Sequence, residues 1–300
     1  MLKYFFVMSV LLMLTGCAGV TRVETTSGTW TEVYTANMIE LVSLHPENEE
    51  SPEEIKTDEP TDTHLEPPEE HEEHDTHVIY EPEDMLAPEI KPETKIIALT
   101  FDDGPVRYTS EILDLLEKYN GRATFCVLGY RVENWAETVL RTVSQGSEVV
   151  GHSWTHRNMT NLDEEQIREE ILAPSAAIKE ASGIAPPPLF RAPFGQFNDQ
   201  LKDIAEELGY ALLQWSIDPR DWATRNPILI YEYIMKNATH GSIVLLHDIH
   251  ESTLEAMYLV IPALVAQGFQ LVTASEIIEY VYGQIEAGKV YRGIRPPEED

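Results

Sequence analysis

The sequence has few cysteines and few positive charges. It contains 2 cysteines in 300 residues, and 21 Lys and Arg stand against 52 Asp and Glu, which gives a formal net charge of −31. Two cysteines allow no disulfide framework, so the chain must be stabilised by a hydrophobic core. The negative charge argues against nucleic acid or an anionic membrane surface as the main partner, because both would repel the chain.

Residues 1–16 have the pattern of an export signal, with Lys3 before an apolar run and small residues up to Cys17. The run is shorter than the about 20 residues of a membrane-spanning helix. The stretch "LTGC" resembles the lipobox of bacterial lipoproteins, in which the cysteine is lipidated and becomes the mature N-terminus. The resemblance implies export and anchoring to the bacterial cell membrane through Cys17, facing the envelope, with Cys126 as a lone thiol. The alternative is an ordinary signal peptide.

Residues 17–94 are acidic, rich in proline and poor in large apolar residues. Thr21 to Thr94 carries a net charge of −19, whereas Lys95 to Asp300 carries −13. Such a segment buries too little surface to offset the entropy of ordering it, which predicts a disordered tether. Metal scavenging by its histidines is a second interpretation, although a solvated spacer is simpler. Those histidines are His45, His64, His71, His74 and His77.

From residue 95 to 282, short apolar stretches alternate with amphipathic ones. Parallel strands covered by helices are typical of this order. We predict strands at 95–101, 122–128, 147–152, 188–194, 211–217, 242–248 and 269–274, and helices at 109–121, 134–146, 163–183, 199–209, 226–241 and 252–268. A distorted (β/α) barrel of about seven strands is favoured over an open doubly wound sheet, because no glycine-rich dinucleotide loop is present. Residues 283–300 are expected to be a polar tail.

Unusual polar residues follow several of the predicted strands. In a parallel barrel the C-terminal ends of all strands open on one face, so these residues are expected to share one site. They are Asp102 and Asp103 in "LTFDDGP", His152 and His156 in "GHSWTH", Arg191 in "RAPFG", Asp218 and Asp221 in "DPRDW", and His247 and Asp248 in "LLHD".

The spacing of His152 and His156 brings two imidazoles to one side of a helical turn, which suits a single metal ion. This spacing alone is a weak signal, and a third ligand is needed. One carboxylate of the pair Asp102 and Asp103 can supply it, which leaves a coordination position open as in catalytic zinc sites. The other carboxylate can then accept a proton from water activated by the ion. The metal and Arg191 would offset the repulsion between the two acids.

His247 is a candidate second proton carrier, because an amide nitrogen leaves as an amine only if it is protonated. Asp221, or with less support Asp218, could hold its ring charged. The alternatives are a core histidine and, for the acids, loop capping. Trp222 and Leu245 suit the core and a pocket wall equally well.

The motifs "TFDDGP", "HSWTH", "RAPFG", "DPRDW" and "LLHD" resemble, in order, the five motifs of the polysaccharide deacetylases, also called the NodB homology domain or carbohydrate esterase family 4. The resemblance covers about residues 95–282 and implies a distorted (β/α) barrel. It implies that Asp103, His152 and His156 bind zinc, with cobalt or nickel as alternatives. Two departures are Gly151, where the family often has Asn, and Phe194, where Tyr is frequent.

The resemblance also implies roles around the ion. Asp102 would be the general base with Arg191 as its partner, and His247 the general acid with Asp221 tuning it. The Phe194 backbone N–H would help hold the oxyanion, while Trp222 and Leu245 would line a pocket for the acetyl methyl group.

The expected function is metal-dependent removal of N-acetyl groups from N-acetylglucosamine units of a cell-envelope polysaccharide, with peptidoglycan as the first choice of substrate. An O-acetyl esterase acting on acetylated xylan uses the same chemistry and is the closest alternative. A catalytically silent surface lipoprotein that binds glycan or metal is another, although it would need neither Asp102 nor His247. We expect a monomer that binds no nucleic acid.

Overall fold

A computed structural model of the chain describes residues 21–24, 30–33, 90 and 93–294. The chain divides into two units, Met1–Thr63 and His64–Asp300. In the first, β1 (Thr21–Glu24) and β2 (Trp30–Val33) pair antiparallel. These strands lie in the segment predicted to be disordered, and their Thr, Val and Trp residues are types that favour strands. The predicted signal peptide, Cys17, nearly all of the remaining tether and residues 295–300 lie outside the described residues.

The second unit is built on one sheet in which every strand pairing is parallel. Its strands are β3 (Lys95–Asp102), β4 (Thr124–Val127), β5 (Glu148–Gly151), β6 (Leu189–Phe190), β7 (Ala211–Leu213), β8 (Ser242–His247), β9 (Phe269–Leu271) and β10 (Val290–Tyr291). The order is β10-β7-β6-β5-β4-β3-β8, and β9 pairs with the first residues of β3. The seven predicted strands are all present, as is the parallel arrangement.

The sheet curls until two isolated bridges join β8 to the opposite end of the sheet, and one of them pairs Ser242 antiparallel with Gly293, beyond β10. Beyond β7, Ile217 forms an isolated parallel bridge with Val244 of β8. The Leu245 N–H donates to the Ile217 carbonyl at 2.9 Å. These bridges involve far fewer residues than the pairing of β8 with β3, so the barrel closes only weakly at this point. The predicted distorted barrel is confirmed.

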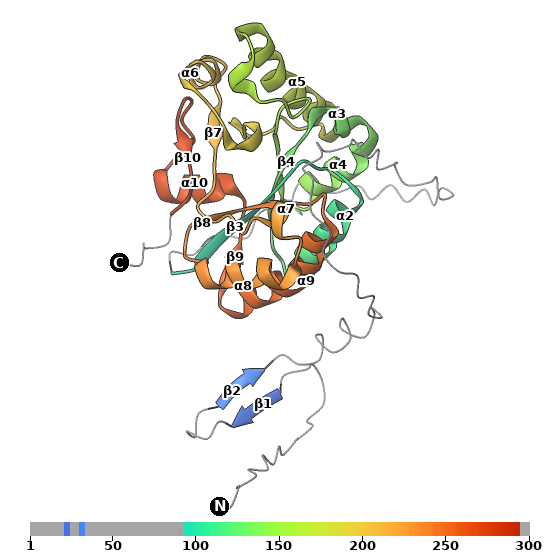
Figure 1. Cartoon of the computed structure of the whole chain (residues 1–300), viewed down its shortest axis with the longest axis vertical. Helices are drawn as coiled ribbons and strands as arrows, with labels where there is room; N and C mark the ends of the chain where they lie inside the picture. The colour runs from blue at the N-terminus through green and yellow to red at the C-terminus, as the bar shows by residue number, and fades with distance from the viewer. Residues whose placement is uncertain (1–20, 25–29, 34–89, 91–92, 295–300) are drawn as a thin grey trace, which may run out of the picture. The chain divides into compact units, whose positions relative to one another are not determined.

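Helices surround the strands of this unit (Figure 1). They are α2 (Arg107–Lys118), α3 (Gly129–Val132), α4 (Ala136–Ser144), α5 (Glu164–Ser182), α6 (Asp199–Glu207), α7 (Asp221–Thr224), α8 (Pro227–Asn237), α9 (Glu251–Ala266) and α10 (Ala274–Tyr282), with 3₁₀ turns at Glu133–Trp135, Met159–Asn161 and Pro193–Gly195. The longest, α5, begins at a capping box of Asp163 with Gln166 and ends at Gly183, whose φ is 73°. None of the described helices is long and apolar enough to cross a membrane.

Alternation along β3 explains how the core positions the site. Ile97, Leu99 and Phe101 pack outward with the helices α2 and α9. Ile96 and Ala98 point the other way, into a cluster with residues of the other strands and of α10. Because side chains alternate along a strand, Thr100 and Asp102 continue this inward series and bring a carboxylate to the end of the barrel interior.

The C-terminal part of the domain differs from the prediction. The helix α10 was not predicted, and β10 lies in the segment expected to be a polar tail. Tyr291 of β10 is buried, and its hydroxyl accepts the Glu286 N–H at 2.9 Å. A strand of two residues is too short to show alternation in the sequence, which is why this pairing with β7 was missed.

Candidate active site

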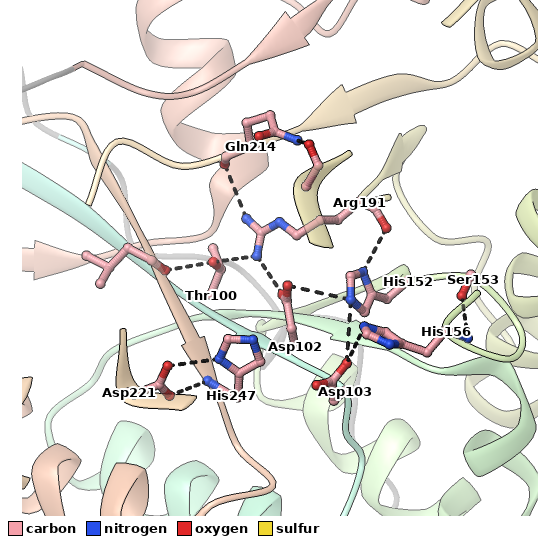
Figure 2. Close-up of polar contacts among 12 residues, drawn as sticks. Thr100, Asp102, Asp103, His152, Ser153, His156, Arg191, Gln214, Asp221 and His247 are labelled. Carbon is pink, nitrogen blue, oxygen red and sulfur yellow. Dashed lines mark hydrogen bonds and ion pairs between the residues drawn. The ribbon is translucent and has the colours of Figure 1, made fainter. Parts of the chain in front are cut away.

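The strand ends bring the predicted polar residues together (Figure 2). Asp102 ends β3 and His247 ends β8, and the two are direct partners in the parallel register. His152 and Arg191 directly follow β5 and β6. The His152 Nδ1 lies 2.7 Å from the Arg191 carbonyl oxygen, and since a carbonyl only accepts, Nδ1 donates. The unprotonated Nε2 of neutral His152 is therefore left for a metal ion.

Asp103, His152 and His156 form a candidate metal site. Asp103 Oδ1 lies 3.5 Å from His152 Nε2 and 3.3 Å from His156 Nε2, and the three ligand atoms lie within 4.8 Å of one another. Asp103 Oδ1 is buried and has no hydrogen-bond partner. A buried, unpartnered carboxylate oxygen is costly, and a cation at this point would satisfy it.

Burial favours the neutral form of each of these three ligands, so it shifts the pKa of the carboxylate and the pKa values of the imidazoles in opposite directions. It raises the pKa of Asp103, and it lowers the pKa values of His152 and His156, which favours the neutral imidazoles that bind metals. The donor set of two imidazoles and a carboxylate therefore fits a divalent cation, although these donors do not choose between zinc, cobalt and nickel.

The loop that carries the two histidines is held by a residue that the sequence analysis missed. The Glu170 carboxylate on α5 is buried and accepts hydrogen bonds from the Trp154 N–H at 2.6 Å, from the Thr155 N–H at 3.1 Å and from the Thr155 hydroxyl at 2.7 Å. Ser153 and His156 have φ of 70° and 58°, a left-handed conformation that non-glycine residues adopt only when surrounding contacts enforce it. Glu170 supplies such contacts.

Replacing Glu170 by Ala is expected to weaken zinc binding by about 10- to 100-fold, the usual effect of losing a group that orients metal ligands. Glu170→Gln keeps an acceptor oxygen and should restore part of the affinity. The measurement is zinc affinity by chelator competition, with circular dichroism to verify folding. The neighbouring exposed Glu169→Ala is the control, and equal affinity in Glu170→Ala and Glu169→Ala would contradict the assigned role.

Arg191 holds Asp102 in its ionised form. Arg191 is fully buried, and its guanidinium donates to Asp102 Oδ1 at 2.6 Å, to the Thr100 hydroxyl at 2.8 Å and to the Gln214 carbonyl at 3.3 Å. Burial opposes the charge on Asp102, but Arg191 and His152 outweigh it and hold the pKa of Asp102 below its ordinary value. Asp102 is therefore an oriented carboxylate that can take a proton. The sequence analysis did not identify Thr100, although it shares the inward face of β3.

His247 has the opposite electrostatics. Its Nδ1 lies 2.9 Å from Asp221 Oδ1, and its backbone N–H donates to Asp221 Oδ2 at 2.7 Å. Thr253 donates to the same oxygen at 2.7 Å. Burial disfavours the imidazolium, but Asp221 outweighs burial and raises the pKa of His247 to about 9. His247 is therefore a protonated acid at neutral pH. The alternative partner, Asp218, instead accepts the Arg220 N–H at 2.8 Å in a turn.

Asp221→Asn is expected to move the alkaline limb of the pH–rate profile down by one unit or more. Without the Asp221 charge, burial dominates and lowers the pKa of His247. The protonated acid exists only below that pKa, so activity lost on raising the pH is lost earlier. Rates of acetate release between pH 5 and 10 measure this. Asp218→Asn removes the same charge without the contact, and equal profiles for the two variants would contradict the prediction.

The predicted substrate-binding residues lie around this centre. The Phe194 ring lies edge-on to the His156 ring at 4.6 Å between centroids and is 59% exposed. Leu245 is buried two residues before His247 on the same face of β8. Trp222 follows Asp221 and is 45% exposed. Their contacts with substrate remain predictions.

Comparison with known proteins agrees with this geometry. The family model for polysaccharide deacetylase matches residues 89–213. The peptidoglycan-N-acetylmuramic acid deacetylase PdaC of Bacillus subtilis is 40% identical over 63% of this chain, and this chain spans only 40% of that protein. A peptidoglycan-N-acetylglucosamine deacetylase of Bacillus cereus is 37% identical over 67% of this chain and 96% of its own length.

Solved structures show the same fold. The PdaC structure matches with a TM-score of 0.62 and 39% identity, over 65% of this chain and 95% of that one. A family 4 acetyl xylan esterase from Clostridium thermocellum, in complex with a cobalt ion, matches with a TM-score of 0.61 and 32% identity, over 67% of this chain and 99% of that one.

Proposed function

The chain belongs to the polysaccharide deacetylase family, carbohydrate esterase family 4, and on this basis we propose that it removes N-acetyl groups from N-acetylglucosamine units of peptidoglycan. The observation that carries the proposal is one site that joins a metal-ligand triad, an ionised Asp102 and a protonated His247. Hydrolysis of an amide requires both a base and an acid. The pKa of Asp102 is lowered and that of His247 is raised, so Asp102 is assigned as the base and His247 as the acid. The peptidoglycan deacetylases among its relatives support the substrate.

A divalent cation bound by Asp103, His152 and His156 would polarise the acetyl carbonyl and lower the pKa of the attacking water. Asp102, held by Arg191, accepts the proton of that water. His247 donates its proton to the departing sugar nitrogen, so that the products are acetate and a glucosamine unit. Asp221 keeps His247 charged until that step. The Phe194 N–H is assigned to the developing oxyanion, and Trp222 and Leu245 to the acetyl methyl group.

Zinc is the proposed native ion. Two histidines with one carboxylate and an open position form a common catalytic zinc set. The cobalt ion in a related esterase supports a divalent site of this kind. Metal content after purification, measured by mass spectrometry, tests the choice.

Export and lipid anchoring through Cys17 are proposed from the sequence pattern of residues 1–17. A monomeric state is proposed as well. Membrane fractionation of cells that express the wild type and Cys17→Ser tests the anchor. Release of Cys17→Ser into the soluble fraction is expected, and equal membrane retention of both proteins would contradict anchoring by this residue.

Acetate release from N-acetylglucosamine oligomers, peptidoglycan and acetylated xylan, measured in parallel with the zinc-loaded chain, tests the function. Release from both N-acetylated glycans is expected. Release from xylan alone would make the protein an O-acetyl esterase, and no release from any glycan by zinc-bound protein would support the silent lipoprotein.

A further inference from the structure

Two arginines beside the general acid form no ion pair with a carboxylate among the described residues. Arg220 and Arg225 flank the short helix α7, both are exposed, and within residues 93–294 neither forms an ion pair. Three arginines elsewhere in the domain, Arg122, Arg141 and Arg168, each form an ion pair with a carboxylate. Residues Lys95 to Asp300 carry a net charge of −13, and guanidinium groups without an ion pair in such a segment have hydrogen-bond donors available for a ligand.

Arg220 directly precedes the partner of His247, and Arg225 is linked to His247 through His250. The first residue of α7 is Asp221, which binds His247. Arg225 donates to His250 Nδ1 at 2.8 Å, and the His250 ring lies 6.0 Å from the His247 ring between centroids. His250 therefore links the catalytic acid His247 to the guanidinium of Arg225.

Trp222 lies between the two arginines in the sequence and contacts Arg220 through its exposed ring and Arg225 through its backbone carbonyl. The Arg220 guanidinium lies over the Trp222 ring, 5.3 Å from its centroid. Arg225 Nε donates to the Trp222 carbonyl at 2.8 Å. The exposed Trp222 side chain, which is assigned to the acetyl methyl group, thus adjoins donors for an anion.

The backbone of both arginines is unusual. Arg220 and Arg225 have φ of 55° and 46°, in the left-handed region. Non-glycine residues there are uncommon and gather at functional sites. The carboxylate of Asp218 is engaged by the Arg220 backbone N–H and does not pair with its guanidinium. Arg131 and Arg157, which follows the metal ligand His156 in the sequence, also lack an ion pair within the described part of the chain.

We propose that Arg220 and Arg225 form an anion subsite that binds a carboxylate carried by the glycan next to the acetylated sugar. The inference rests on the proposed function and narrows its substrate class to glycans with free carboxylates, such as peptidoglycan strands whose muramic acid lactyl groups carry no stem peptide, in contrast to neutral chitin-like oligomers and xylan. Guanidinium groups bind carboxylates with charge-assisted hydrogen bonds. Local positive charge beside the active site also offsets the repulsion that Lys95 to Asp300, with a net charge of −13, exerts on an anionic polymer.

The test compares three tetrasaccharides with the zinc-loaded full chain. One is neutral N-acetylglucosamine tetramer, the second is a peptidoglycan tetrasaccharide with free lactyl carboxylates, and the third is the same compound with those carboxylates converted to methyl amides. The readout is kcat/KM for acetate release at low and high salt. The free carboxylate should be preferred to its amide by about tenfold at low salt, and high salt should reduce that preference.

Arg220→Gln and Arg225→Gln should each lower the preference for carboxylate over amide at least about threefold, and Arg220→Lys should restore part of it. A variant that merely disturbs Asp221 or His247 would slow both compounds equally and leave their ratio unchanged. Lys236→Gln, which removes one exposed positive charge at the far end of α8, is the control and should keep the wild-type ratio.

A ratio of one in the wild type, or a ratio unaffected by both arginine variants, would overturn the anion subsite while acetate release itself still supports a deacetylase. No release from any of the three compounds would instead overturn the proposed function.

Discussion

Asp102→Asn is expected to lower kcat for acetate release by about 1000-fold while zinc affinity stays within about threefold of the wild type. Asn cannot accept the proton of the attacking water, and a positioned general base contributes roughly 10²- to 10⁴-fold. The substitution keeps the size of the side chain and leaves Asp103, His152 and His156 in place as the metal ligands. Steady-state rates on an N-acetylglucosamine oligomer, paired with zinc titration, separate the two effects.

His152→Ala is the matched comparison, because it removes a metal ligand and should lose both zinc affinity and activity. If Asp102→Asn lost zinc as well, Asp102 would belong to the ligand set. Normal turnover in either variant would contradict the assignment of the two residues.

The second large effect is expected for His247→Ala, and it should depend on the leaving group. Release of acetate from an N-acetylated sugar should fall by about 10²- to 10⁴-fold, because the amine cannot leave without a proton. Hydrolysis of 4-nitrophenyl acetate, whose phenolate leaves unprotonated, should fall by less than about tenfold, since it needs no general acid. The ester is an internal control for folding and metal content.

Equal losses on the amide and the activated ester would contradict a general-acid role. They would show that His247 supports the site by position alone, through its contact with Asp221.

The strand pattern of the barrel could be predicted because its buried strands are short apolar runs bounded by helices and turns. β3 and β8 are the clearest cases. Convergence of the motifs also followed from sequence, since strands of a parallel barrel end on one face. The two strands in the acidic segment, the helix α10 and the pairing of β10 with β7 did not follow, because such short or isolated elements carry little pattern of their own.

Residue spacing is not sufficient to assign the different roles of Asp102 and Asp103. Asp102 is the last residue of β3 and faces inward to Arg191, whereas Asp103 turns away with φ of 75° and faces the two histidines. Spacing alone left the two acids interchangeable, and the turn after the strand separates them. Glu170 could not be found either, because it lies among other acids of α5 and only the folded loop shows its partners.

The most direct test of a metal-dependent deacetylase is acetate release from N-acetylglucosamine oligomers by the full chain, first stripped of metal with a chelator and then titrated with zinc. We predict no release from the stripped protein and full activity at one zinc per chain. Undiminished release without metal, or no release with one zinc bound, would contradict this account.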